Sequence, residues 1–128
     1  MLYRKAYDRL LTWKGQPKRK ALCVMGARQI GKTTLIRQFG KEQYSCFVEV
    51  NFITDTDATK IFAGNLDANT IITNLTAYTR KPMIPGNTLV LLDEIQACPN
   101  ARTAIKFLVE DGRFDYIESG SLLGVRHK

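Results

Sequence analysis

The chain has 128 residues, of which 45% are hydrophobic, and a formal net charge of +7. This length suits a single domain, and the hydrophobic fraction excludes intrinsic disorder as the default. No stretch approaches the ~20 apolar residues of a membrane helix, and residues 1–11 lack the apolar segment of a secretory signal. Three widely spaced cysteines without a C-x-x-C pair argue against a disulfide scaffold or a zinc site, and indicate a cytoplasmic protein.

The basic excess is concentrated near the N-terminus. Residues 1–20 hold seven basic residues and one acidic residue, whereas residues 21–128 hold twelve and eleven. Such a segment serves as a nucleic-acid or anion footprint in some proteins and as a solvated linker in others. The solvated linker is the preferred interpretation, and nucleic-acid binding through residues 4–20 stays open.

Apolar spacing predicts helices that alternate with strands. Residues 2–13 show the spacing of one helix face, and a loop follows at 14–17. A continuous apolar run predicts a buried strand at 21–25, and a helical pattern follows at 32–39 with Gly40 as its C-cap. Further along we expect strands at 46–52, 88–92 and 116–119, a short helix capped by Thr54 or Asp55, one or two helices within 61–79 broken near 64–69, and a helix from Pro99 to Asp111-Gly112.

One segment fits the phosphate-binding pattern G-x-x-x-x-G-K-[ST] at every fixed position, after an apolar strand and before a helical pattern. Glycines let the backbone approach a phosphate closely, successive N–H groups form an anion nest, and the following helix adds about +0.5 charge. Lys32 would bridge the β- and γ-phosphates, and the Thr33 hydroxyl would bind Mg²⁺. The residues expected to hold the nucleotide are Gly26, Ala27, Arg28, Gln29, Ile30, Gly31, Lys32, Thr33 and Thr34.

A second segment brings two carboxylates to the end of a strand, because residues 88–92 run directly into Asp93 and Glu94. Open α/β sheets bind ligands at the carboxyl ends of their strands. Asp93 is therefore expected to hold Mg²⁺ through water, opposite Thr33, and Glu94 to orient or activate the attacking water. A turn with solvated acids would explain the pair in isolation, but the phosphate-binding pattern favours the metal-and-water interpretation.

These features predict an α/β fold: a three-layer α/β/α P-loop NTPase core with a mostly parallel sheet. One domain would span residues 1–128, with an N-terminal helix and basic linker at 1–20. The 61 positions from Lys32 to Asp93 leave room for an intervening strand with its helices. A glutamate directly after the aspartate favours water activation over a small-molecule kinase, which must protect its phosphoryl group from water.

Four segments of the chain together resemble the ATPase domain of a bacterial and archaeal AAA+-superfamily group that usually carries a C-terminal DUF4143 region. These segments are residues 26–35, 92–96, 106–107 and 120–125. The resemblance covers nearly the whole chain. It implies ATP as the nucleotide, Mg²⁺ as the metal, and a sensor-type polar residue after the fourth strand. Ser121 is the preferred position for that residue, and Ser119 is the next.

The resemblance also implies parts that lie beyond Lys128. A fifth core strand, a lid over the nucleotide and the C-terminal region are expected to be absent, so the fold would be C-terminally truncated. Near the other end, Tyr7, Leu10 and Trp13 would either flank the adenine or simply pack the first helix on the sheet.

The leading prediction is an ATP-binding AAA-type domain that hydrolyses ATP to ADP and phosphate in the complete protein. Lys32, Glu94 and Ser121 are the expected catalytic residues. A nucleotide-dependent switch or assembly module with little turnover is one alternative, and a nucleic-acid-binding module is another. Besides ATP, a second copy of the chain or a protein partner is expected, and a membrane is not.

Overall fold

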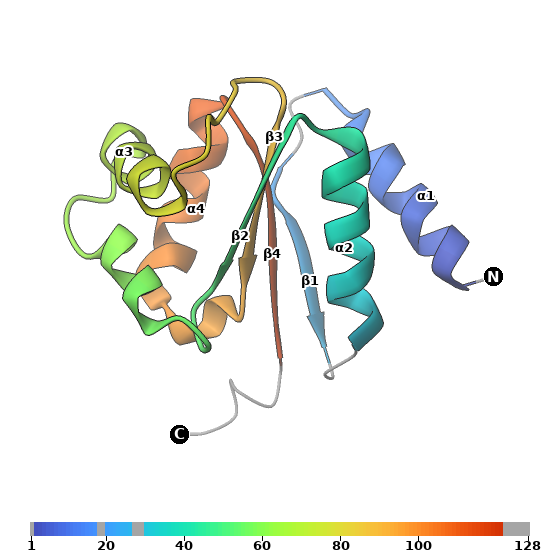
Figure 1. Cartoon of the computed structure of the whole chain (residues 1–128), viewed down its shortest axis with the longest axis horizontal. Coiled ribbons are helices and arrows are strands. Elements are labelled where there is room, and N and C mark those ends of the chain that lie inside the picture. The colour runs from blue at the N-terminus through green and yellow to red at the C-terminus, as the bar shows by residue number, and fades with distance from the viewer. Residues whose placement is uncertain (1, 18–19, 27–29, 122–128) are drawn as a thin grey trace.

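The computed structural model describes residues 2–17, 20–26 and 30–121. These residues form one parallel four-stranded sheet in the order β1-β4-β3-β2. Helices cover both of its faces, with α1 and α2 on one side and α3 and α4 on the other (Figure 1). The predicted three-layer α/β/α fold is therefore confirmed. The strands are β1 (Leu22–Gly26), β2 (Cys46–Asn51), β3 (Thr88–Asp93) and β4 (Asp115–Ser121).

Most of the expected helices are present close to their predicted bounds. No helix among the described residues is long and apolar enough to cross a membrane. The helices are α1 (Leu2–Lys14), α2 (Ile30–Gln43), α3 (Ala68–Thr79) and α4 (Pro99–Asp111), with short 3-10 helices η1 (Thr56–Phe62) and η2 (Ile95–Ala97).

Strand β3 explains how the two hydrophobic layers are joined. Leu89 and Leu91 pack toward α1 and α2, whereas Val90 and Leu92 pack toward α3 and α4. All four side chains are fully buried. A strand buried on both faces needs a continuous apolar run rather than alternation, and residues 89–92 supply one.

Helix α1 is held to the sheet through α2. The rings of Tyr7 and Trp13 contact Phe39 of α2 with centroid distances of 5.7 and 6.4 Å. Leu10 and Trp13 are buried in the same hydrophobic layer as Leu89. These contacts correspond to the second of the two predicted roles, the packing of α1 against the rest of the fold.

The expected C-cap at Gly40 is wrong. Helix α2 continues to Gln43, and Gly40 is buried inside it. A Cβ atom on Gly40 would lie 2.2 Å from Cδ1 of Phe47 on β2. Glycine is therefore needed here because α2 approaches β2 closely, and not because the helix ends.

Two other helix ends follow different rules. Helix α4 ends as predicted at Gly112, which adopts the left-handed conformation with φ 81°. Helix α3 ends at Arg80, which adopts the same conformation with φ 56°, although no glycine is available there.

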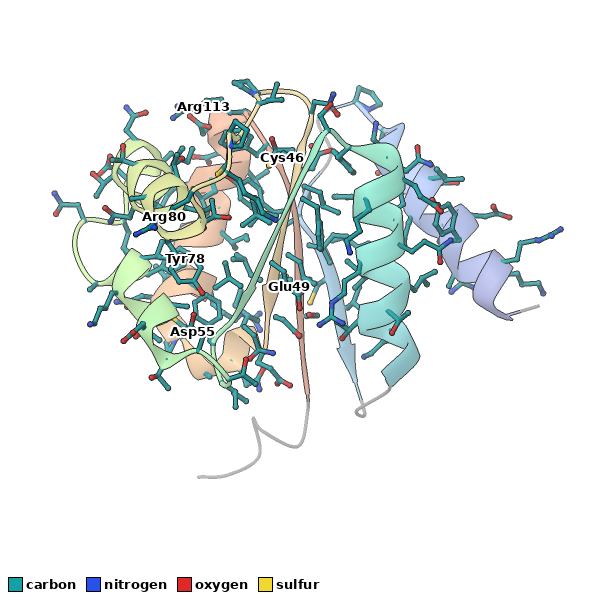
Figure 2. All side chains as sticks on the ribbon, viewed as in Figure 1. Cys46, Glu49, Asp55, Tyr78, Arg80 and Arg113 are labelled. Carbon is teal, nitrogen blue, oxygen red and sulfur yellow. The ribbon has the colours of Figure 1, made fainter. Side chains whose placement is uncertain are left out.

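The expected cap at Asp55 is confirmed, since its side chain accepts a hydrogen bond from the Asp57 N–H at 3.2 Å. Figure 2 shows Asp55 below Tyr78 of α3, whose hydroxyl donates to the Asp55 carboxylate.

Candidate functional site

The carboxyl ends of β1, β3 and β4 and the start of α2 lie at the same edge of the sheet (Figure 1). Gly26 ends β1, and Ile30 begins α2. The predicted loop residues Ala27, Arg28 and Gln29 lie outside the described residues. The described part nevertheless has the strand-then-helix context that the phosphate-binding pattern requires.

The first turn of α2 carries the remaining residues of this pattern. Lys32 and Thr33 are half-buried, whereas Gly31 and Thr34 are exposed. The first N–H groups of a helix lack intrahelical acceptors and carry partial positive charge. No acidic residue occupies this turn. The start of α2 therefore offers an anion N–H donors that lack intrahelical acceptors, on the turn that carries Lys32.

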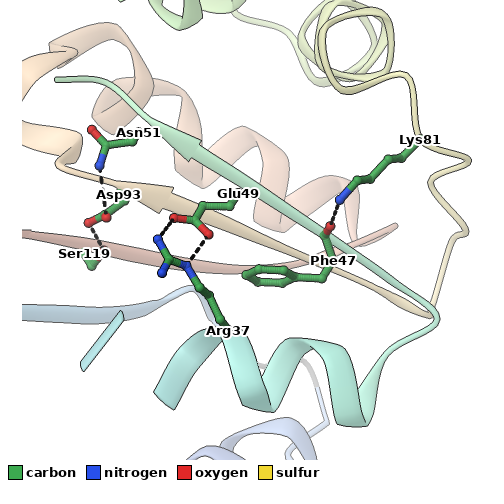
Figure 3. Close-up of polar contacts among 7 residues, drawn as sticks. All are labelled: Arg37, Phe47, Glu49, Asn51, Lys81, Asp93 and Ser119. Atoms are coloured by element: carbon green, nitrogen blue, oxygen red, sulfur yellow. Dashed lines mark hydrogen bonds and ion pairs between the residues drawn. The ribbon is translucent and has the colours of Figure 1, made fainter. Parts of the chain in front are cut away.

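Asp93 lies at the centre of a hydrogen-bond network between three strands. Its side chain is buried, with 8% exposure. Oδ1 accepts hydrogen bonds from the Ser119 hydroxyl at 2.7 Å and from the Glu94 N–H at 2.9 Å. Oδ2 accepts one from Nδ2 of Asn51 at 3.3 Å (Figure 3). Residues at the ends of β2, β3 and β4 thus fix the orientation of one carboxylate.

The two serines predicted as polar sensors occupy different positions on β4. Ser119 contacts Asp93 directly. Ser121 pairs in register with Gly26, the last residue of β1. Its backbone thus lies beside the strand that leads into the loop, and its side chain is outside the described set. The preference for Ser121 remains a prediction, and Ser119 joins the candidate site.

Asn51 is a site residue that the sequence reasoning missed. Its Oδ1 accepts hydrogen bonds from the N–H groups of Ile53 and Thr54 at 2.9 and 3.0 Å, while its Nδ2 donates to Asp93. A polar residue directly after the apolar alternation of β2, in the position that Asp93 has on β3, was the available signal. Asn51 thus links the turn after β2 to the buried carboxylate of Asp93.

Glu94 leaves β3 in an unusual backbone conformation. Its φ and ψ are 54° and 46°, in the left-handed region that residues other than glycine rarely adopt. Oε1 of Glu94 accepts a hydrogen bond from Nε2 of Gln96 at 2.8 Å. The carboxylate that was expected to activate water is therefore anchored to the short helix η2.

Arg37 follows Thr33 by one helical turn on α2. It makes two hydrogen bonds to Glu49 of β2, from Nε to Oε1 at 2.7 Å and from Nη2 to Oε2 at 2.8 Å (Figure 3). The hydrogen bond to Glu49 is the main cause that raises the pKa of Arg37, and the charges of Glu49 and Asp93 also raise it. This pair ties α2 to β2 and places a cation within the electrostatic reach of Asp93.

The oxygen donors at this edge suit a hard divalent cation. Magnesium binds through one or two carboxylates together with substrate phosphates and water, and rarely through a cage made by protein alone. Thr33 and Asp93 supply a hydroxyl and a carboxylate of this type. The described residues hold no cluster of three or more His, Cys, Asp and Glu side chains arranged for a metal. The donor chemistry therefore fits Mg²⁺ bound jointly with phosphate.

Solved structures with a similar fold include proteins of much greater length. The Aeropyrum pernix ORC1 protein, solved in complex with DNA, matches with a TM-score of 0.54 and 16% identity over 96% of this chain and 38% of that one. The C. elegans protein PCH-2 matches with a TM-score of 0.52 and 17% identity over 94% and 36%. This chain thus spans less than two-fifths of either protein, and the likeness concerns the fold alone.

The sequence itself gives a more specific assignment. None of the curated proteins matches it. The profile of the AAA domain family, by contrast, matches residues 18–128, which include both predicted motifs and all four strands. The chain therefore belongs to the AAA domain family.

Proposed function

We propose that the chain is the nucleotide-binding domain of an ATPase that hydrolyses ATP to ADP and phosphate when the protein is complete. The observation that carries this proposal is the common location of two motifs. The first turn of α2, with Lys32 and Thr33, begins at the edge where Asp93 is held by Ser119 and Asn51. Membership of the AAA domain family supports the same function.

Nucleotide binding would use the start of α2. Its first N–H groups, which lack intrahelical acceptors, and the Lys32 ammonium bind the phosphate oxygens, and together they stabilise negative charge that develops on the γ-phosphate. Thr33 and Asp93 would hold Mg²⁺, which would neutralise negative charge on the phosphates. The contacts of Asp93 with Ser119 and Asn51 keep its carboxylate oriented before any ligand arrives.

Hydrolysis would depend on Glu94. Its carboxylate orients a water molecule and accepts a proton from it as the water oxygen bonds to the γ-phosphorus and the bond to the β,γ-bridging oxygen breaks. Gln96 already holds Oε1 of this carboxylate. Two polar residues of β4 are proposed to support this step. Ser119 acts through its hydrogen bond to Asp93, and Ser121 through its place beside Gly26.

The decisive experiment measures Mg-ATP binding to the 128-residue chain by calorimetry. Lys32→Ala should weaken binding roughly 10-fold or more, because it removes a charged donor to phosphate. Lys41→Ala is the matched control, since Lys41 lies exposed near the other end of the same helix. Equal affinity of Lys32→Ala and the unmodified chain would remove the assignment. Glu94→Gln should leave binding intact and reduce phosphate release.

A nucleotide-dependent switch with little turnover is the second candidate. The Gln96 amide leaves one carboxylate oxygen of Glu94, Oε2, for a water molecule, so turnover depends on whether that oxygen reaches water beside the γ-phosphate. Phosphate release measured against protein concentration separates the two functions. A steep rise favours catalysis that is completed between copies of the chain or by a protein partner, and no release at any concentration favours the switch.

Nucleic-acid binding through residues 4–20 stays a separate prediction. Arg4, Lys5 and Arg9 are exposed on α1. About six phosphate contacts would make the affinity fall steeply as salt increases, which is the measurement that tests it.

A further inference from the structure

The side chain of Gln96 is only half satisfied. Its Nε2 donates to Oε1 of Glu94 at 2.8 Å, whereas its Oε1 is buried and has no hydrogen-bond partner among the described residues. A buried acceptor without a donor lowers stability, and a methionine or leucine of similar size would avoid that cost. Packing alone therefore does not explain a glutamine at this position.

The neighbouring backbone carries a second unfavourable feature. Glu94 adopts the left-handed conformation, which destabilises residues other than glycine. Both features lie within three residues of each other, on the two residues that form the Glu94–Gln96 hydrogen bond. Strained backbone and unsatisfied polar groups concentrate at sites where function constrains the structure.

The segment that carries Gln96 is rigidly placed. The N–H of Ala97 donates to the Glu94 carbonyl at 3.0 Å, and the N–H of Cys98 donates to the Ile95 carbonyl at 2.9 Å. Ile95 and Cys98 are buried in the core, with 0% and 4% exposure. The amide of Gln96 is therefore held by a fixed turn, so its hydrogen bond restricts the position of the more flexible glutamate.

We propose that Gln96 is a positioning residue for Glu94. Its amide N–H occupies Oε1 of the carboxylate, and no donor among the described residues occupies Oε2, which is left for the water molecule. This inference rests on the proposed ATPase function. Holding the carboxylate beforehand removes the entropy cost of orienting it during the reaction.

The chain offers a matched control for this contact. Nε2 of Gln38 donates to Oε2 of Glu42 at 3.1 Å on α2, which is the same chemistry in an exposed pair. Gln96→Met and Gln38→Met therefore remove equivalent hydrogen bonds, one beside the predicted site and one away from it. Methionine preserves the length of the side chain and removes the unpaired acceptor.

The first measurement compares binding, turnover and thermal stability. Gln96→Met should leave the dissociation constant of Mg-ATP within about twofold and lower kcat roughly 10- to 100-fold, since misplacement of a reacting group by about 1 Å has that effect. Its melting temperature should not fall, and Gln38→Met should change neither constant. A joint loss of stability and affinity would indicate a structural role only. A rise in turnover would indicate that Gln96 holds Glu94 away from the reaction. Either result overturns the proposal.

The second measurement does not need turnover. In spectra of the ¹⁵N-labelled chain, the side-chain amide pair that disappears in Gln96→Met identifies Gln96. Glu94→Ala should shift this pair and speed its exchange with solvent, without affecting the pair of Gln38. Addition of Mg²⁺ with a non-hydrolysable ATP analogue should shift it as well. A Gln96 pair that responds to neither change overturns the proposal, even in a chain without measurable turnover.

Failure of this inference and failure of the proposed function have different signatures. If Lys32→Ala binds Mg-ATP as tightly as the unmodified chain, the proposed function fails. If binding needs Lys32 but kcat and the Gln96 resonances ignore the substitutions at Gln96 and Glu94, only the positioning role fails.

Discussion

The hydroxyl of Ser119 donates a hydrogen bond to Oδ1 of Asp93 at 2.7 Å, between the adjacent strands β4 and β3. Both residues are buried, with 6% and 8% exposure. Because Asn51 donates to the other oxygen from β2, Asp93 is fixed from both neighbouring strands. A carboxylate held in this way needs little rearrangement to bind a cation, and such supporting contacts tune metal ligands in many proteins.

Removal of the Ser119 hydroxyl should therefore affect both stability and Mg²⁺-dependent binding. Ser119→Ala should lower the free energy of unfolding by about 1–3 kcal/mol, because Asp93 loses a donor in a buried position. It should also weaken ATP binding more in the presence of Mg²⁺ than in its absence. Denaturant unfolding and calorimetry measure the two effects. Ser45→Ala is the control, since the exposed Ser45 hydroxyl accepts a hydrogen bond from Asn87 at the opposite end of the sheet. A change above about 0.5 kcal/mol in this variant would be unexpected.

The fold could be predicted largely because local signals agree with the tertiary structure. The apolar run of residues 89–92 predicts a strand buried on both faces, and it is buried on both. Pro99 and Gly112 mark the ends of α4 as the rules for helix termini require. The predicted end of α2 was wrong because Gly40 is required by the close approach of Phe47, and a rule for helix ends cannot detect such a tertiary contact.

Gly40→Ala tests that explanation. On helix propensity alone alanine should stabilise α2, but its Cβ would lie 2.2 Å from the Phe47 ring, so the helix or the ring must shift. We expect the free energy of unfolding to fall by about 1–3 kcal/mol. Gly64→Ala is the control, because a Cβ there meets nothing within 4 Å, and its effect should be neutral or stabilising. Equal stability of Gly40→Ala and the unmodified chain would contradict the close-approach argument.

The candidate site shows a different limit of sequence reasoning. Ser119 and Ser121 are two residues apart, so the alternation expected of a strand cannot distinguish them from the sequence. The register between strands determines which serine lies beside Asp93: Leu92 pairs with Glu118, so the following residue, Asp93, lies level with Ser119. That register depends on the packing of the whole sheet. Asn51 was missed for the same reason, since its partner Asp93 is 42 residues away in the sequence.

Two helix ends allow a reciprocal test of left-handed caps. Arg80 and Gly112 both adopt this conformation, and their N–H groups donate to Thr76 at 2.8 Å and to Leu108 at 3.3 Å. Arg80→Gly should raise the free energy of unfolding by about 0.5–1 kcal/mol, because glycine avoids the steric cost. Gly112→Ala should lower it by about 1 kcal/mol. Denaturant unfolding of both variants measures the effects, and changes of the same sign would contradict the shared explanation.

The contact between Tyr78 and Asp55 predicts how stability depends on alkaline pH. The hydrogen bond to Asp55, followed by burial, raises the pKa of Tyr78 to about 12 from its ordinary value of 10.0. Between these values the unfolded chain releases the Tyr78 proton while the folded chain retains it, so the proton stabilises the folded state below pH 10. That contribution is lost progressively as pH rises to about 12, and stability should fall in this window.

Tyr78→Phe isolates this effect. The variant loses the hydrogen bond to Asp55, and its stability should decline less steeply than that of the unmodified chain between pH 10 and pH 12. Urea unfolding at several pH values measures the slope, and the difference in ultraviolet absorbance between the two chains follows ionisation of Tyr78 itself. An absorbance difference that titrates near pH 10, or parallel slopes of stability for the two chains, would show that Asp55 does not retain the Tyr78 proton.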